Sequence, residues 1–139
     1  MKLNHRSLHT ARIADAILFW PALVVVIVAE LSSFGGRTIL PIDDKILHFA
    51  AYFLLAAMAA AAFKTRWPVV YAVLGLIALG GILEIIQDFV GRELSFWDQV
   101  ANTLGALSGG FLGRLAVEPL RRRYTDDEIL EGERPNAHI

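Results

Sequence analysis

The chain alternates between four long apolar stretches and short polar segments. The apolar stretches cover residues 13–31, 46–63, 68–89 and 99–117. Each is close to the roughly 20 residues that a helix needs to cross a hydrocarbon core about 30 Å thick. Pro68 stands at the start of the third stretch, where a first helical turn tolerates proline. The pattern predicts an all-α fold, namely a polytopic membrane protein with a transmembrane bundle of four helices.

Composition supports this class of protein. Hydrophobic residues make up 55% of the 139 residues and charged residues 19%, with a mean hydropathy of +0.50. A chain with this composition is too apolar for an ordinary soluble domain of this size. The chain contains no cysteine, so a disulfide, a thiolate nucleophile and an iron–sulfur cluster are excluded. No basic groove interleaved with aromatic residues is present, and we expect no nucleic-acid partner.

The distribution of basic residues predicts the orientation of the helices, because Lys and Arg in short loops are retained on the cytoplasmic side. With the amino terminus inside, ten of the thirteen basic residues are cytoplasmic, and only Arg37, Lys45 and Arg92 lie outside. We therefore expect a multi-pass protein of the bacterial inner (plasma) membrane with both termini in the cytoplasm. Residues 1–12 and a charged tail, 118–139, then flank a membrane domain formed by residues 13–117. The tail is expected to be a short surface helix grading into disorder.

Polar side chains of three apolar stretches gather at one depth in the predicted bilayer. They are Asp44, Lys45, His48 and Tyr52 at the start of the second stretch, Glu84 and Gln87 near the end of the third, and Asp98 and Asn102 at the start of the fourth. Spacings of three or four residues place the members of each group on one helix face. Because the second and fourth helices run inward and the third runs outward, all three faces are expected to meet within the outer one or two turns.

Small residues in the fourth stretch predict how these helices approach one another. Ala101, Gly105, Gly109 and Gly113 recur at intervals of four, a pattern that lets the backbones of two membrane helices come close together. The predicted contact would bring the polar faces into register. Gly75, Gly80 and Gly81 of the third stretch are interpreted in the same way, as small residues for packing.

Three motifs in this order resemble the signature of the VanZ-like family of membrane proteins. They are Asp44–Tyr52 (DKILHFAAY), Glu84–Gln87 (EIIQ) and Asp98–Gly105 (DQVANTLG). The resemblance extends over about residues 43–113. It implies an integral membrane protein of the cell envelope, in a family named after a member linked to antibiotic resistance, specifically against the glycopeptide teicoplanin.

The leading functional hypothesis is an outward-facing polar pocket that recognises a ligand at the outer leaflet. A glycopeptide antibiotic and a lipid-linked cell-wall component are the expected ligands. The predicted ligand-binding residues are Asp44, Lys45, His48, Tyr52, Glu84, Gln87, Arg92, Asp98 and Asn102. Lys45 and Arg92 could hold a phosphate or carboxylate near the headgroups, while the excess of carboxylates in the outer segments would favour a cationic ligand.

Two alternatives stay open. In a membrane-embedded enzyme, His48 would act as the general acid or base, with Asp44 or Glu84 orienting it. In a structural or assembly protein without a ligand, the same side chains would form hydrogen bonds between helices, each contributing about 0.6 kcal/mol. No cofactor is expected. Asp44, His48, Glu84 and Asp98 are residue types that bind divalent metals, but no recognised ligand spacing supports a metal site.

Overall fold

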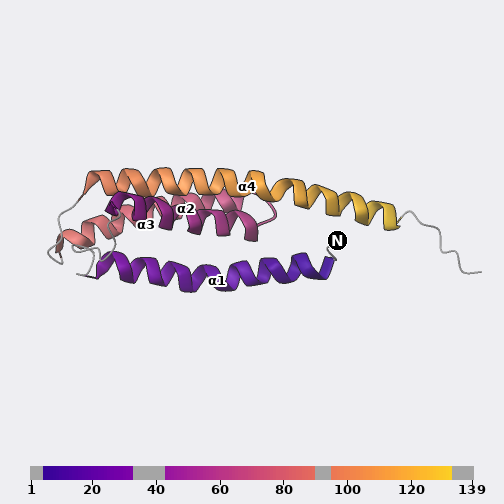
Figure 1. The fold of residues 1–139 in the computed structure, drawn as a ribbon, viewed down its shortest axis with the longest axis horizontal. Helices are drawn as coiled ribbons and strands as arrows, with labels where there is room; N and C mark the ends of the chain where they lie inside the picture. The colour runs from indigo at the N-terminus through magenta and orange to yellow at the C-terminus, as the bar shows by residue number, and fades with distance from the viewer. Residues whose placement is uncertain (1–4, 33–42, 90–94, 133–139) are drawn as a thin grey trace, which may run out of the picture.

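The structure, a computed structural model, describes residues 5–32, 43–89 and 95–132. Side chains are described for those of these residues that lie between positions 17 and 119. Within these residues it is entirely helical. Its four helices are α1 (His5–Leu31), α2 (Asp44–Ala62), α3 (Arg66–Phe89) and α4 (Phe96–Gly132). Figure 1 shows α4 above α2 and α3, with α1 below them and the long end of α4 extending beyond the other helices. The predicted all-α class is confirmed.

Local sequence sets where the helices begin and end. Asp43 caps α2, because its side chain accepts a hydrogen bond from the backbone N–H of Lys45 at 3.0 Å. Ser95 occupies the equivalent position before α4, where its hydroxyl oxygen accepts from the N–H of Asp98 at 3.3 Å. Hydrophobicity predicts that the fourth span ends at Val117, but helix α4 itself continues through Pro119 to Gly132.

Helices α2 and α4 form the closest contact in the molecule. Gly105 and Gly109 leave no room for a β-carbon, which would overlap the backbone carbonyls of Phe49 and Phe53 respectively. One turn further, a β-carbon at Gly113 would lie 2.9 Å from the α-carbon of Ala57. The glycine row predicted from the sequence thus packs against a row of α2 residues that also recurs every four positions.

The apolar core lies between α2, α3 and α4, and α1 packs against it from one side. Its buried residues are Tyr52, Leu55, Ala56, Ala60, Val69, Val73, Leu76 and Ala106. From α1, Phe19 and Leu23 are partly buried against this core. The alanines of α2 and α4 keep the core thin, so the helices are held by close backbone packing rather than by large interlocking side chains.

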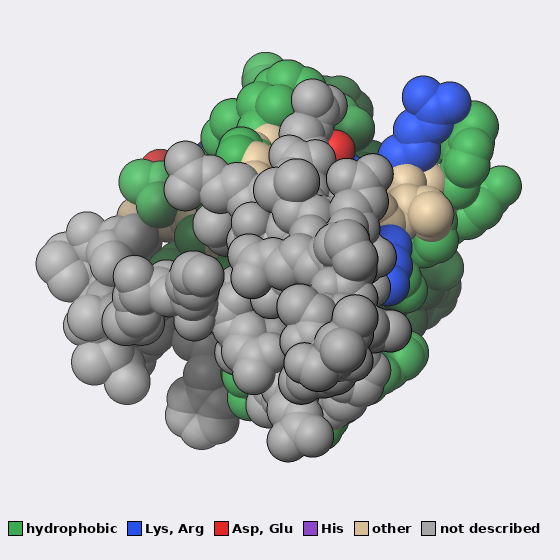
Figure 2. Space-filling model, turned by 90° about the vertical axis from the view of Figure 1, so that its right-hand side faces the viewer, with side chains coloured by type: hydrophobic (Ala, Val, Ile, Leu, Met, Phe, Trp, Pro, Cys, Tyr) green, Lys and Arg blue, Asp and Glu red, His purple; other side chains and the backbone are tan. Residues whose placement is uncertain are grey.

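Large hydrophobic side chains are exposed on all four helices, among them Val25, Leu54, Leu74 and Leu115, each more than half exposed. Figure 2 shows the molecule from the end where α2 turns into α3, and there hydrophobic side chains dominate the described surface, with basic side chains beside them. By length and composition, α2 and α3 could cross a membrane. The apolar described part of α1, Ile17–Leu31, is shorter.

The glycine row provides a test of the α2–α4 contact. Gly109→Ala should lower the free energy of unfolding by about 1–3 kcal/mol, because the added methyl group overpacks a backbone contact. Gly75→Ala is the matched control, since a β-carbon there meets nothing within 4 Å and alanine favours the helix by up to about 1 kcal/mol. Thermal unfolding in detergent measures both. Equal stability of the two variants would show that α2 and α4 do not pack along this row.

Candidate functional site

Polar residues converge at the end of the bundle where α1 and α3 end and α2 and α4 begin (Figure 1). We call this group the polar cluster. It consists of Glu30, Asp44, Lys45, His48, Tyr52, Glu84, Gln87, Asp98 and Asn102. Tyr52 and Asn102 are completely buried, and the side chains of Glu30, His48 and Glu84 nearly so. All four helices contribute at least one member.

His48 lies at the centre of the polar cluster. Its Nδ1 is 3.1 Å from Oδ1 of Asn102 and 3.3 Å from Oε1 of Glu30. On the other side of the ring, Nε2 is 3.9 Å from Oδ2 of Asp44, one turn earlier on α2. Since both partners of Nδ1 are oxygen acceptors, the geometry requires a proton on Nδ1. Nε2 faces a carboxylate at a distance too long for a hydrogen bond.

Glu30 ties α1 to the other helices. Its carboxylate Oε2 accepts a hydrogen bond from the hydroxyl of Tyr52 at 3.3 Å. Its backbone oxygen accepts from Nε2 of Gln87 at 3.0 Å. The end of α1 is therefore held by side chains of both α2 and α3, and these bonds satisfy polar groups in an environment with little water.

Two carboxylates from α3 and α4 lie beside His48. Glu84 accepts a hydrogen bond from the backbone N–H of Ser95 at 3.1 Å and interacts electrostatically with Asp98, His48 and Glu30. Asp98 lies 3.8 Å from the ammonium group of Lys45, whose side chain is half exposed. The Glu84 contact joins the end of α3 to the start of α4.

Several buried polar atoms of this region have no hydrogen-bond partner among the described residues. They include Oε1 of Glu84, Oδ1 of Asp98, Oε1 of Gln99 and Nδ2 of Asn102. An unsatisfied buried polar group costs about 1–3 kcal/mol, and more when it is charged. Oε1 of Glu84 is therefore a carboxylate oxygen with a strong demand for a further donor or cation, while Oδ1 of Asp98 lacks a hydrogen bond but has the ammonium group of Lys45 at 3.8 Å.

Gly80 lets three of these polar side chains come close to α3. A β-carbon at this position would lie 2.9 Å from Oε1 of Gln99, 3.0 Å from Nδ2 of Asn102 and 3.2 Å from the hydroxyl of Tyr52. The sequence prediction that Gly80 serves packing agrees with this geometry. Gly75, which was interpreted in the same way, faces open space.

Eight of the nine ligand-binding residues predicted from the sequence belong to the polar cluster. Arg92, the ninth, lies outside the described residues. The sequence predicted a site built from three helices and did not include Glu30 of α1 among its residues. A signal for Glu30 was available, because it is the sole ionisable residue in the apolar run from Ile17 to Leu31, and such residues within a predicted span indicate a site. Gln99, which donates to the backbone oxygen of Ile77 at 3.1 Å, was also missed.

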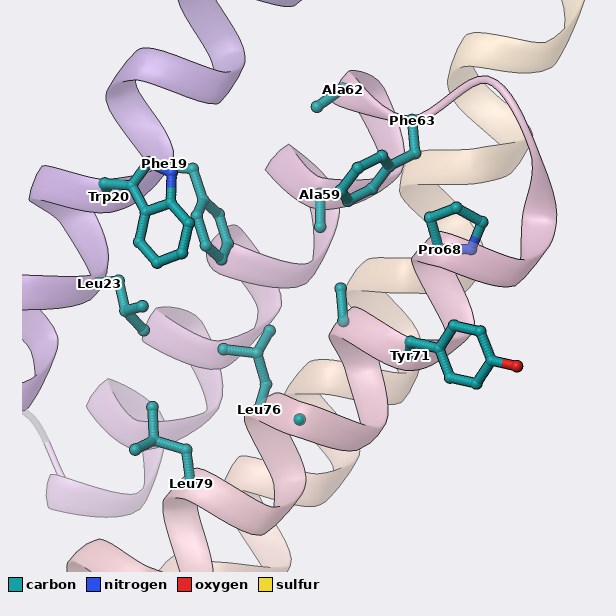
Figure 3. Close-up of a pocket in the computed structure, with 12 residues that line it drawn as sticks. Phe19, Trp20, Leu23, Ala59, Ala62, Phe63, Pro68, Tyr71, Leu76 and Leu79 are labelled. Carbon is teal, nitrogen blue, oxygen red and sulfur yellow. The ribbon is translucent and has the colours of Figure 1, made fainter.

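An apolar cavity of about 780 Å³ lies between α1, α2 and α3, nearer to the α2–α3 turn. Figure 3 shows Phe19, Trp20 and Leu23 of α1 facing Ala59 and Leu76 across it, while the hydroxyl of Tyr71 points away. None of the twelve lining residues carries a charge. This cavity is separate from the polar cluster and was not predicted from the sequence.

Comparisons with known proteins add no relatives. No protein-family profile, no curated protein and no solved structure matches the chain significantly.

The hydrogen bond from Tyr52 to Glu30 can be tested with a double-mutant cycle. Tyr52→Phe should lower the free energy of unfolding by about 1–3 kcal/mol, because it leaves one oxygen of a buried carboxylate without its donor. The same change in a Glu30→Gln background should cost less, since a neutral amide tolerates the loss better than a carboxylate. The free energy of unfolding in detergent is measured for the wild type, the two single variants and the double variant. Together these values give the coupling energy between the two side chains. Additive effects would mean that the two side chains do not interact.

Proposed function

We propose that this chain is a VanZ-like, multi-pass protein of the bacterial inner membrane, with four spans and both termini in the cytoplasm. The hydrophobic side chains exposed on all four helices support a membrane location, because a monomeric soluble protein rarely exposes apolar surface on such a scale. Aromatic side chains at both ends of the bundle, Trp67 and Tyr71 at one and Phe96 and Trp97 at the other, suit the two membrane interfaces. In this orientation the polar cluster lies at the outer end.

The absence of native cysteine makes the topology directly testable. A cysteine introduced at Asp88, which is exposed near the outer end of α3, should react with a membrane-impermeant maleimide in intact spheroplasts. A cysteine at Thr65, which is exposed in the α2–α3 turn, should react only after the membrane is permeabilised. The reverse labelling pattern would refute the orientation, and labelling of both in intact spheroplasts would refute a span through α3.

The proposed function of the polar cluster is to bind a ligand presented at the outer leaflet. The observation that carries this proposal is the pair of buried carboxylates, Glu84 and Asp98, each with one oxygen that has no hydrogen-bond partner among the described residues. Ionised groups within a bilayer are costly and usually mark a functional site. A bound species that brings positive charge or hydrogen-bond donors to these oxygens would remove the penalty.

A lipid-linked cell-wall component or a glycopeptide antibiotic is the ligand that we propose. Either would meet the protein at the outer leaflet, and either offers polar groups that complement carboxylates and amides. The separate apolar cavity supports a lipid-linked ligand, because a cavity of about 780 Å³ with an uncharged lining suits a hydrocarbon chain. Lys45, half exposed at the rim, is placed to contact a phosphate or carboxylate of the ligand.

The contacts of His48 favour one second candidate, a membrane-embedded enzyme. A histidine whose Nδ1 lies 3.3 Å from a carboxylate oxygen, and whose Nε2 is 3.9 Å from the carboxylate of Asp44, too far for a hydrogen bond, has the arrangement of a general base. Glu30, rather than Asp44 or Glu84, is then the orienting carboxylate. In an enzyme of this type, His48→Gln should abolish turnover while binding of the ligand persists, whereas a binding protein shows no turnover at all.

Direct binding tests the proposed function. Purified protein in lipid nanodiscs is titrated with teicoplanin and, separately, with undecaprenyl-linked cell-wall precursor, while tryptophan fluorescence is followed. We expect saturable binding of one of them, weakened at least about tenfold by Glu84→Gln. Glu118→Gln is the matched control, because it makes the same change in a partly exposed carboxylate near the opposite end, where Glu118 pairs with Arg114 at 3.3 Å.

The outcomes separate the hypotheses. Binding that Glu84→Gln weakens and Glu118→Gln leaves unchanged supports a ligand site in the polar cluster. Absence of saturable binding of either probe, or equal affinity in all three proteins, contradicts it and favours a structural network.

A further inference from the structure

Three side chains of the polar cluster offer ligand atoms to one point. Asp44, His48 and Asp98 each have one nitrogen or oxygen ligand atom within 4.8 Å of those of the other two. Asp44 and His48 are four residues apart on α2, so their side chains lie on one helix face. Asp98 approaches from α4, which the glycine row holds close to α2.

The hydrogen bonds around His48 prepare it as a ligand. Nδ1 contacts Glu30 and Asn102, two residues outside the three-residue group. The lone pair is therefore on Nε2, the ring nitrogen nearer to Asp44. Histidines that bind metals almost always donate their other N–H to a carboxylate or carbonyl in this way. The 3.9 Å between Nε2 and Oδ2 of Asp44 is too long for a hydrogen bond. It is close to the separation of about 3.4 Å expected for two ligands of one tetrahedral zinc ion.

Asp98 supplies an independent observation. Its side chain is about nine-tenths buried, and Oδ1 has no hydrogen-bond partner among the described residues. The nearest cation is the ammonium group of Lys45, at 3.8 Å, on a flexible side chain that is half exposed. A metal ion could displace this ammonium group into the interface, because lysine has several rotatable bonds and a strongly hydrated head.

We propose that Asp44, His48 and Asp98 bind one divalent transition-metal ion of the zinc type. One imidazole nitrogen and two carboxylate oxygens are ligands that Zn²⁺ accepts. Glu30 and Asn102 orient His48, and Lys45 competes with the ion for Asp98. This inference deepens the proposed function, on which it rests for the placement of the cluster at the outer surface. Three protein ligands leave a coordination position open, which a phosphate or carboxylate oxygen of the outer-leaflet ligand would take.

Metal binding is tested with Zn²⁺ alone, on full-length protein purified without a histidine tag. His5, His9 and His138 are replaced by glutamine so that His48 is the only histidine. After treatment with a chelator, the protein is titrated with Zn²⁺ and its metal content is measured by mass spectrometry. We expect one ion per chain and a thermal midpoint that rises with Zn²⁺ concentration, as for any ligand that binds only the folded state.

Variants locate the site. His48→Gln and Asp98→Asn should abolish the stoichiometric binding, and Glu30→Gln should weaken it about 10- to 100-fold, as is typical for partners of a metal-bound histidine. Asp88→Asn is the matched control, since it makes the same change in an exposed carboxylate at the same end of the bundle. Lys45→Gln should increase affinity, a gain that misfolding cannot produce.

Fewer than one ion per chain, or affinity unchanged by both His48→Gln and Asp98→Asn, would overturn the metal site. Binding of teicoplanin or lipid-linked precursor measured in the absence of Zn²⁺ distinguishes this failure from failure of the proposed function. If that binding persists without metal and Zn²⁺ does not bind, the ligand site stands and the metal site is wrong.

Discussion

The close approach of α2 and α4 sets the positions of the central side chains of the polar cluster. Glycines at positions 105, 109 and 113 let the two backbones meet almost without intervening side chains. This contact fixes the register between the start of α2, which carries His48, and the start of α4, which carries Asp98 and Asn102. The 3.1 Å contact between His48 and Asn102 follows from this register. A displacement of one helical turn, about 5.4 Å, would separate them.

The same packing explains why most of the polar cluster is buried, with Asp44 and Lys45 at its exposed edge. Thin, alanine-rich helices bring α1 and α3 near the α2–α4 pair, so that Glu30 reaches Tyr52 and Gln87 donates to the backbone of α1. The apolar cavity lies where α1 and α3 separate toward the opposite end. One end of the bundle therefore concentrates carboxylates, histidine and amides, and the uncharged cavity lies nearer the other end. This division gives a ligand with a polar head and an apolar chain two distinct places to bind.

Much of this arrangement could be predicted from the sequence, because helix periodicity and residue size are local properties. The spacing of Asp44, His48 and Tyr52 predicted one face of α2, and the glycine interval predicted that α4 packs closely against another helix, without identifying that helix as α2. The role of Glu30 could not be predicted in the same way, since it depends on how α1 packs, and α1 has neither a polar face nor a row of small residues at its end. The convergence of Asp44, His48 and Asp98 likewise depends on a contact between two helices. The spacing of residues within one segment cannot reveal such a contact. The four-span topology remains a proposal, supported by the exposed apolar side chains.

The central claim is that the buried carboxylates are kept for binding rather than for stability. Unfolding of the ligand-free protein in detergent, compared with Glu84→Gln and Asp98→Asn, tests it most directly. The amide of glutamine can still accept the hydrogen bond from Ser95, while the cost of burying a charge disappears. We predict that both variants are as stable as the wild type or more stable. A loss of more than about 1 kcal/mol in both would show that the charged network holds the fold together, and would contradict the account.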